Sequence, residues 1–217
     1  MEAKEIIARR AAQEIRPDTL VNLGIGLPSM VASFLPAGVN VFFQAENGVI
    51  GLGARPPEGM EDPDLTDAGG GFVTAVPGAA SIDSAMSFGL IRGGHLDMTV
   101  LGGLQVDAAG RLANWMVPGK MVPGMGGAMD LVAGARRVIV AMVHTAKGRP
   151  KIVIECDLPL TATRRVDLIV TEMAVIEPTD AGLVLRECAP GITADAVQTA
   201  TATPLIIPDD LPEMKLG

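Results

Sequence analysis

Aromatic residues are scarce in the 217-residue sequence, which has five Phe, one Trp and no Tyr. Proteins that bind single-stranded nucleic acid rely on aromatic side chains for base stacking. Basic residues are also too few for a surface that binds the phosphate backbone of a nucleic acid, because 17 Lys and Arg stand against 25 Asp and Glu, a net charge of −8. Both shortages argue against nucleic acid as a partner.

Cysteines and long apolar runs are scarce too. Cys156 and Cys188 have neither the spacing of metal ligands nor the number that a disulfide framework needs. The apolar run at 131–143 is interrupted by Arg136 and Arg137, and no run reaches membrane-spanning length. The N-terminal segment carries mixed charges and no apolar signal core. We therefore expect a cytoplasmic protein that does not interact with a membrane.

Apolar residues are plentiful at 48% of the chain, which is enough for a sizeable core. The 26 Gly and 16 Pro are scattered among the apolar runs rather than gathered in one tract. This distribution is typical of a globular protein with many tight turns. With no internal repeat and no convincing linker, we expect a single domain over residues 1–217.

Strand and helix patterns alternate over the first two thirds of the chain. Strands are expected at 19–22, 39–43, 72–76, 98–101 and 138–143. Helices are expected at 2–15, 28–34, 81–91 and 128–135. The later part is richer in strands, expected at 152–155, 166–171, 174–176 and 183–186, before a helix at 194–200. This order predicts an α/β fold with an open, mostly parallel sheet and flanking helices.

One carboxylate, Glu46, stands between an apolar run and glycines in FFQAENGVIGLG, residues 42–53. In open α/β sheets, ligands bind beyond the carboxyl ends of the strands. Glu46 is expected at such an end. From the pattern alone, the favoured interpretation of Glu46 is a structural carboxylate that accepts backbone N–H groups of its own turn.

Glycines recur in three loops, NLGIGLP, ENGVIGLG and PGMGGAMD. Such loops can bring backbone N–H groups close to an anion or a carbonyl oxygen. A dinucleotide-binding motif is excluded because Ser29 stands where its third glycine belongs, and a phosphate loop is excluded because no hydroxyl residue follows Lys120.

The stretch FQAENGVIG at 43–51 resembles the glutamate signature of the family I CoA-transferases, in the subunit that carries the catalytic carboxylate. Further blocks are similar to that family in the same order: NLGIGLP, IRGGHLD, LANWMVPGKMVPGMGGAMDLV and CDLPLT. Within the family, the likeness is nearest to the B-type subunits of the 3-oxoacid (succinyl-CoA:acetoacetate) enzymes. Two residues depart from it: Ala45 replaces a usual serine, and Gly70 replaces a lysine common in the long acidic loop at 54–71.

The resemblance implies the fold of the CoA-transferases and a covalent mechanism. Glu46 would be the nucleophile that forms a glutamyl anhydride and then a glutamyl–CoA thioester. Gly127 would supply an oxyanion N–H group. The other implied positions contact the substrate (Asn22, Gly24, Gly26 and Ala128) or shape the loops (Gly48, Gly51 and Gly126). Coenzyme A is then a substrate, and neither a metal nor an organic cofactor is required.

The resemblance also implies a separate A (alpha) subunit, in an α2β2-type assembly. The expected substrates are an acyl-CoA such as succinyl-CoA and a 3-oxo acid such as acetoacetate. Two alternatives stay open: the B-type subunit of a 3-oxoadipate CoA-transferase, and a non-catalytic protein of related fold that binds CoA or a sugar phosphate. Outside these motifs, His95 and His144 are interpreted as structural, and Lys147, Arg149 and Lys151 as a solvated turn.

Overall fold

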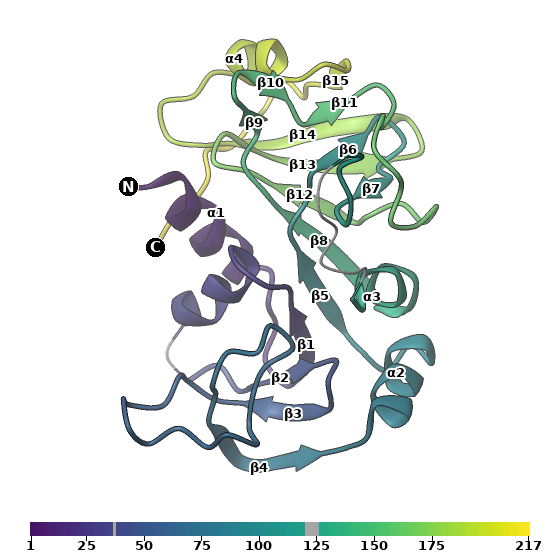
Figure 1. The fold of residues 1–217 in the computed structure, drawn as a ribbon. Coiled ribbons are helices and arrows are strands. Elements are labelled where there is room, and N and C mark those ends of the chain that lie inside the picture. The colour runs from purple at the N-terminus through teal and green to yellow at the C-terminus, as the bar shows by residue number, and fades with distance from the viewer. Residues whose placement is uncertain (37, 120–125) are drawn as a thin grey trace.

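In the part of the chain that the structure describes, ten strands form one sheet in the order β15-β14-β13-β12-β8-β5-β1-β2-β3-β4. The computed structural model in Figure 1 describes residues 1–36, 38–119 and 126–217. The strands of this sheet are β1 (Thr19–Leu23), β2 (Val41–Ala45), β3 (Val49–Leu52), β4 (Ala75–Ser81), β5 (Met98–Leu101), β8 (Arg137–Ala141), β12 (Leu168–Val170), β13 (Ala174–Thr179), β14 (Gly182–Cys188) and β15 (Leu205–Ile206).

The centre of the sheet is parallel. Strands β12, β8, β5, β1 and β2 are neighbours with parallel pairing throughout. β3 and β4 continue the sheet antiparallel at one edge, while β13 and β14 do so on the other side. Apolar and β-branched residues fill the central strands, as expected for parallel strands that are covered on both faces. The predicted α/β fold is confirmed.

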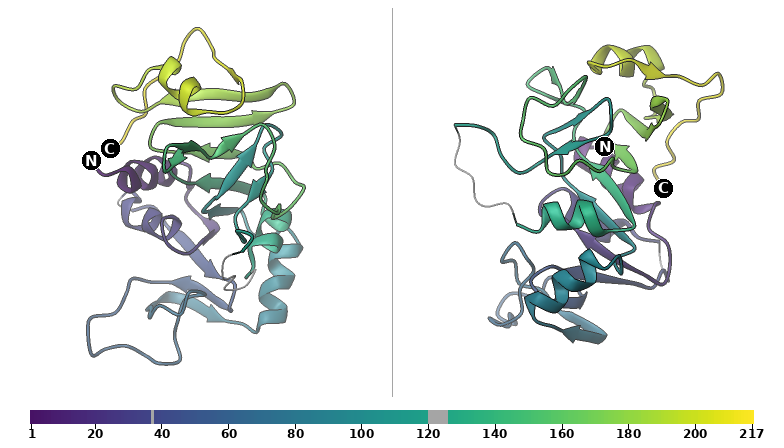
Figure 2. Two further views of the ribbon diagram at one scale, coloured as in Figure 1. Left: turned by 45° about the horizontal axis from the view of Figure 1, so that its top comes forward. Right: turned by 90° about the vertical axis from the view of Figure 1, so that its right-hand side faces the viewer.

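Helices cover both faces of the sheet, as Figure 2 shows. α1 (Ala3–Ala12) and the 3-10 helix η1 (Pro28–Phe34) pack together on one face. α2 (Ser84–Arg92) and α3 (Ala128–Gly134) pack together on the other face. α4 (Ala194–Ala200) lies beside β14 at the far end. No helix in the described ranges is both long enough and apolar enough to cross a membrane.

Successive side chains of the central strands point to opposite faces of the sheet, so the core has one apolar cluster on each face. Val100 and Ile139 belong to the apolar cluster around α1. Leu101 and Val138, each one residue along the same strands, belong to the cluster around α2 and α3. Since side chains alternate across a strand, every second residue of β1, β2 and β5 points toward α2 and α3.

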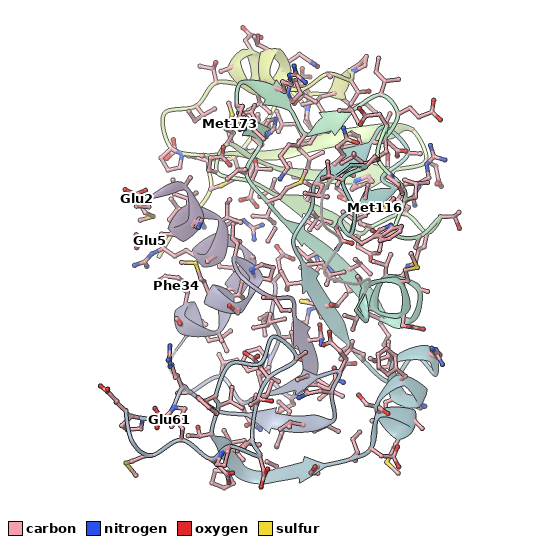
Figure 3. All side chains as sticks on the ribbon, in the orientation of Figure 1. Glu2, Glu5, Phe34, Glu61, Met116 and Met173 are labelled. Carbon is pink, nitrogen blue, oxygen red and sulfur yellow. The ribbon has the colours of Figure 1, made fainter. Side chains whose placement is uncertain are left out.

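A smaller sheet lies in the upper part of the molecule as drawn in Figure 1. It contains β11 (Ile152–Val153), β6 (Gln105–Asp107) and β7 (Leu112–Ala113). A short hairpin of β9 (Thr145–Ala146) and β10 (Arg149–Pro150) precedes β11. In Figure 3, Met116 marks the segment after β7, while Glu61 marks the long loop at the opposite end of the molecule.

Two expectations on the edge of the sheet are wrong. β4 lies at Ala75–Ser81 rather than at 72–76, and α2 begins three residues later than expected. The helix begins at Ser84 because the Asp83 side chain caps it, accepting a hydrogen bond of 2.7 Å from the Met86 N–H. The assignment of residues 1–217 to a single domain stays a prediction.

Candidate active site

Glu46 directly follows β2, at the carboxyl end of a central parallel strand. Its turn closes when Gly48 N–H donates to the Ala45 carbonyl at 3.0 Å. Gly48 has φ +123°, and a Cβ there would lie 2.0 Å from the Ile82 carbonyl oxygen. Only glycine fits this position, so the predicted role of Gly48 in shaping the turn has a clear physical basis. Glu46 itself is half-buried.

Asn22, in the neighbouring strand β1, holds one oxygen of this carboxylate. Its Nδ2 lies 3.1 Å from Glu46 Oε2, 3.0 Å from the Gln44 carbonyl oxygen and 3.1 Å from Gln44 Oε1. Asn22 and Gln44 are paired in the β1–β2 register, and both are buried. A buried amide that donates to a carboxylate fixes the direction in which the carboxylate points.

The other carboxylate oxygen faces the backbone before α3. A Cβ built on Gly127 would lie 3.1 Å from Glu46 Cγ and 3.4 Å from Oε1. Gly127 precedes the first residue of α3, and its carbonyl accepts a hydrogen bond of 2.9 Å from Leu131 N–H. The two oxygens of Glu46 are therefore distinct: Oε2 is held by Asn22, and Oε1 lies on the Gly127 side.

Glu46 lines two cavities. The first has a volume of about 180 Å³ and lies between the β1–η1 loop and the long loop. The second has a volume of about 370 Å³ and lies between β5 and the start of α3. Gly24, Ile25 and Glu46 belong to both linings. A carboxylate shared by two adjoining cavities can contact ligands in both.

The remaining sequence-predicted positions divide into three groups. Gly24 and Gly26 line the first cavity, while Gly126 and Ala128 line the second beside Gly127. Gly51 lies in strand β3 rather than in the Glu46 turn, at an irregularity in the pairing with β4. Residues 120–125, part of a block that carries the family resemblance, lie outside the described residues.

The two departures from the family pattern lie in different environments. Ala45 is 4% exposed, and it lines the first cavity directly beside Glu46. Gly70 is exposed in the long loop, where its N–H donates to the Asp67 carbonyl at 3.0 Å. Ala45 is therefore the departure that bears directly on the site.

The long loop is tied to the Glu46 turn by Asn47. The Asn47 side chain donates a hydrogen bond of 2.8 Å to the Thr66 carbonyl. The next residues of the loop, Asp67, Ala68 and Gly69, line the first cavity. Asn47, the residue that follows Glu46, thus fixes one wall of that cavity.

Lys151 does not lie in a solvated turn, so the interpretation from the sequence is wrong for this residue. Its Nζ donates a hydrogen bond of 2.6 Å to the Gly103 carbonyl, and burial lowers its pKa to about 8 despite the opposing effect of Glu172. Asn114 Nδ2 donates to the adjacent Gly102 carbonyl at 3.1 Å. Two side chains from elsewhere in the chain therefore hold this wall of the second cavity, and no local sequence signal indicates it.

His144 is structural, as predicted. It is fully buried, with Nδ1 2.9 Å from Thr171 Oγ1 and Nε2 2.9 Å from Thr201 Oγ1. Burial lowers its pKa to about 4, so the ring is neutral at pH 7. Across the described residues, no three His, Cys, Asp or Glu side chains gather in a way that could hold a metal ion.

The fold is shared with solved structures of known activity. An acyl-CoA transferase apoenzyme from Escherichia coli O157:H7 matches with a TM-score of 0.79 and 24% identity, over 99% of this chain and 43% of that chain. This chain thus spans less than half of that longer one. A structure of the decarboxylase AibA/AibB matches with a TM-score of 0.74 and 22% identity, over 99% of this chain and 89% of that chain. The fold alone therefore does not decide the reaction.

Relatives found by sequence similarity identify the family more specifically than the shared fold does. The beta subunit of the acetate CoA-transferase of Escherichia coli K12 is 55% identical over 97% of this chain and 97% of that protein. The corresponding protein of Haemophilus influenzae is 52% identical over 100% and 97%. The B-type subunit of the succinyl-CoA:3-ketoacid coenzyme A transferase of Helicobacter pylori 26695 is 49% identical over 91% and 96%. All three names describe a B or beta subunit.

The family itself is shown by a match that covers most of the chain. The sequence profile of the coenzyme A transferase family matches residues 4–200. Together with relatives about half identical over nearly their whole length, this match confirms the resemblance found in the sequence. The chain belongs to the coenzyme A transferase family, as an enzyme subunit of the B, or beta, type.

Proposed function

We propose that Glu46 is the nucleophile of a reaction that moves CoA from an acyl-CoA to a short carboxylic acid. The observation that carries this proposal is the position of Glu46, at a central strand end and shared by two cavities. One oxygen is held by Asn22, while the other lies beside the Gly127 backbone. A purely structural carboxylate has no need of two adjoining cavities.

In the first step, Glu46 attacks the thioester carbonyl, the C–S bond breaks, and CoA leaves as the thiolate. The product is an anhydride between the acyl group and Glu46. The thiolate then attacks the glutamyl carbonyl and releases the first acid, which leaves a glutamyl–CoA thioester. A second acid attacks that thioester, which breaks the C–S bond, regenerates the thiolate and forms a second anhydride with Glu46. The thiolate then attacks the acyl carbonyl of this anhydride, which gives the new acyl-CoA and releases Glu46 as a carboxylate.

A carboxylate is a weak nucleophile, so the rate depends on its positioning and on stabilisation of the tetrahedral oxyanion. Asn22 holds Oε2, which leaves Oε1 on the Gly127 side as the attacking atom. The Gly127 N–H group is the proposed oxyanion donor. A backbone donor suits this chemistry because it cannot protonate Glu46. Asn22 and Gly127 thus have separate roles.

The acid is proposed to be acetate or a 3-oxo acid such as acetoacetate. The relatives most relevant here carry names of both kinds, acetate and 3-ketoacid. The first cavity has a mainly apolar lining, and its charged residues among those described, Glu46 and Asp67, are both acidic. Such a lining favours an uncharged acyl tail over one that carries a second carboxylate. The lining therefore supports acetyl-CoA as a proposed donor, whereas succinyl-CoA, whose acyl tail carries a second carboxylate, is proposed on the name of the 3-ketoacid relative alone.

The proposal includes a separate A, or alpha, subunit, in an α2β2-type assembly, and a cytoplasmic location. Support for the partner comes from the relatives, whose names describe single subunits. The location is supported by the thiols, because neither Cys156 nor Cys188 forms a disulfide. Mixing the purified chain with an A subunit should restore activity that the chain lacks alone.

The test is a panel of CoA transfers by the assembled enzyme. Acetyl-CoA and succinyl-CoA are each offered acetate, acetoacetate or 3-oxoadipate. We expect Glu46→Gln to abolish turnover with every pair, whereas Glu58→Gln, at an exposed position of the long loop, leaves it unchanged. Normal turnover of the Glu46→Gln enzyme would exclude Glu46 as the nucleophile. Transfer to 3-oxoadipate alone would exclude the proposed acids.

A further inference from the structure

A row of buried polar side chains crosses three neighbouring strands beside Glu46. Thr99 of β5 is paired with Asn22 of β1, and Asn22 is paired with Gln44 of β2. Their exposures are 0%, 0% and 2%. All three point to the face covered by α2 and α3, as the alternation along the strands requires. Polar side chains in the centre of a parallel sheet are costly unless each of them finds a hydrogen-bond partner.

The first bond of the row fixes the orientation of the Asn22 amide. Thr99 Oγ1 donates to Asn22 Oδ1 at 3.2 Å. An asparagine side chain has one accepting oxygen and one donating nitrogen, which exchange places when the amide rotates by half a turn. With Oδ1 engaged by a hydroxyl on the β5 side, Nδ2 faces β2 and reaches Glu46 Oε2. The opposite orientation would place Oδ1 against the carboxylate, which is repulsive.

The other end of the row gives the same orientation. Gln44 Nε2 donates to Ser87 Oγ of α2 at 2.8 Å, which turns Gln44 Oε1 toward Asn22 Nδ2. The Asn22 nitrogen therefore meets oxygen atoms on Gln44 and Glu46, and its oxygen meets a donor on Thr99. Within the described chain, every buried side-chain nitrogen and oxygen has a hydrogen-bond partner.

We propose that Thr99 is a positioning residue for the transfer reaction, which acts on Glu46 through Asn22. Its hydroxyl keeps the Asn22 amide in the orientation that holds Oε2 and leaves Oε1 toward Gly127. Thr99 donates its hydroxyl to Asn22 rather than to the carboxylate, and it lines neither of the two cavities beside Glu46, so it is not a catalytic residue. This inference rests on the proposed role of Glu46, and it adds a residue 53 positions further along the sequence that no local motif identifies.

The experiment compares Thr99→Val, Thr99→Ser and Asn22→Ala, alone and as the Thr99→Val/Asn22→Ala double variant, in the assembled enzyme. Valine keeps the shape of threonine without the hydroxyl, while serine keeps the hydroxyl. Turnover, KM for the acyl-CoA and the single-turnover rate of covalent CoA loading are measured for each. Thr171→Val serves as the matched control. It removes the hydroxyl of another fully buried threonine, which is hydrogen-bonded to His144 instead of Asn22.

We expect Thr99→Val to lower kcat and the loading rate by about tenfold or more, with KM changed by less than about threefold. Thr99→Ser should recover most of the rate, and Thr171→Val should lower stability without this loss of rate. In the Asn22→Ala background, Thr99→Val should have little further effect, because the two residues act as one unit.

Two results would overturn the inference. One is a Thr99→Val enzyme with normal kcat and loading rate. The other is a loss of rate of the same size with and without Asn22. If Thr99→Val does not fold, the decision falls to Thr99→Ala and Thr99→Ser, since only the serine variant should retain the rate. Glu46→Gln separates the two proposals: if it remains active the proposed function fails, and if it is inactive while Thr99→Val is normal, only the role of Thr99 fails.

Discussion

Asn22 Nδ2 lies 3.1 Å from Glu46 Oε2, across the boundary between the two central strands β1 and β2. This contact makes the two carboxylate oxygens unequal, because the same Glu46 presents Oε1 to the Gly127 backbone. A nucleophile that is held through one oxygen can attack through the other with little loss of orientation. Substitutions around the carboxylate, in its turn and in the core should therefore have separable effects on rate and on stability.

Gly127→Ala should slow the reaction with little effect on stability. The added Cβ would lie 3.1 Å from Glu46 Cγ, so the carboxylate must move away from its position. We expect kcat to fall by about tenfold or more while the melting temperature changes little. Gly89→Ala in α2 is the control, because a Cβ there meets nothing within 4 Å. An unchanged kcat for Gly127→Ala would show that Glu46 does not require this close contact.

Gly48→Ala should damage the fold rather than the chemistry alone. Its φ of +123° is strained for any other residue, and the Cβ would collide with the Ile82 carbonyl at 2.0 Å. We expect a loss of about 3 kcal/mol or more in unfolding free energy, measured by denaturant titration. Gly59→Ala shares a positive φ of +82° without any atom within 4 Å, and should cost only about 1 kcal/mol. Equal losses of unfolding free energy in the two variants would show that the Cβ at position 48 does not collide with Ile82.

His144 should remain neutral until the pH falls to about 4. Its folded pKa is lowered from 6.5 to about 4 by burial, so the unfolded chain binds more protons between these pH values. Stability should therefore be complete above pH 6.5 and decrease as the pH falls toward 4, by about 3 kcal/mol at most from this group. The NMR signals of the His144 ring, followed against pH, measure this directly. A His144 signal that titrates near pH 6.5 would contradict its burial as a neutral ring.

Much of the fold could be predicted because its central strands are local patterns. The β-branched runs at β5 and β8, and the apolar run that ends at Glu46, identify buried parallel strands without any tertiary information. β3 was missed because its residues lie within a glycine-rich motif that is typical of a loop. β4 was misplaced because it is an edge strand with mostly exposed residues, which leaves no apolar alternation to find.

The site could be predicted only where a motif carries it. Glu46, Asn22 and Gly127 all lie in stretches with a family resemblance. Thr99 and Lys151 do not, because each acts through a contact with a residue distant in sequence, 77 positions away for Thr99 and Asn22 and 48 for Lys151 and Gly103. Acetate as an acid substrate was not expected from the sequence. The names of the relatives and the lining of the first cavity suggest it, since residues that surround a small acid leave no motif of their own.

Covalent attachment of CoA to Glu46, as a thioester, is the central claim. The direct measurement is mass spectrometry of the chain after an acyl-CoA is added to the enzyme assembled with its A subunit, followed by borohydride treatment and peptide mapping. A borohydride-sensitive CoA adduct localised to Glu46, and absent from Glu46→Gln, is the predicted result. CoA transfer at the normal rate with no adduct on Glu46, or with the adduct on another residue, would contradict the account.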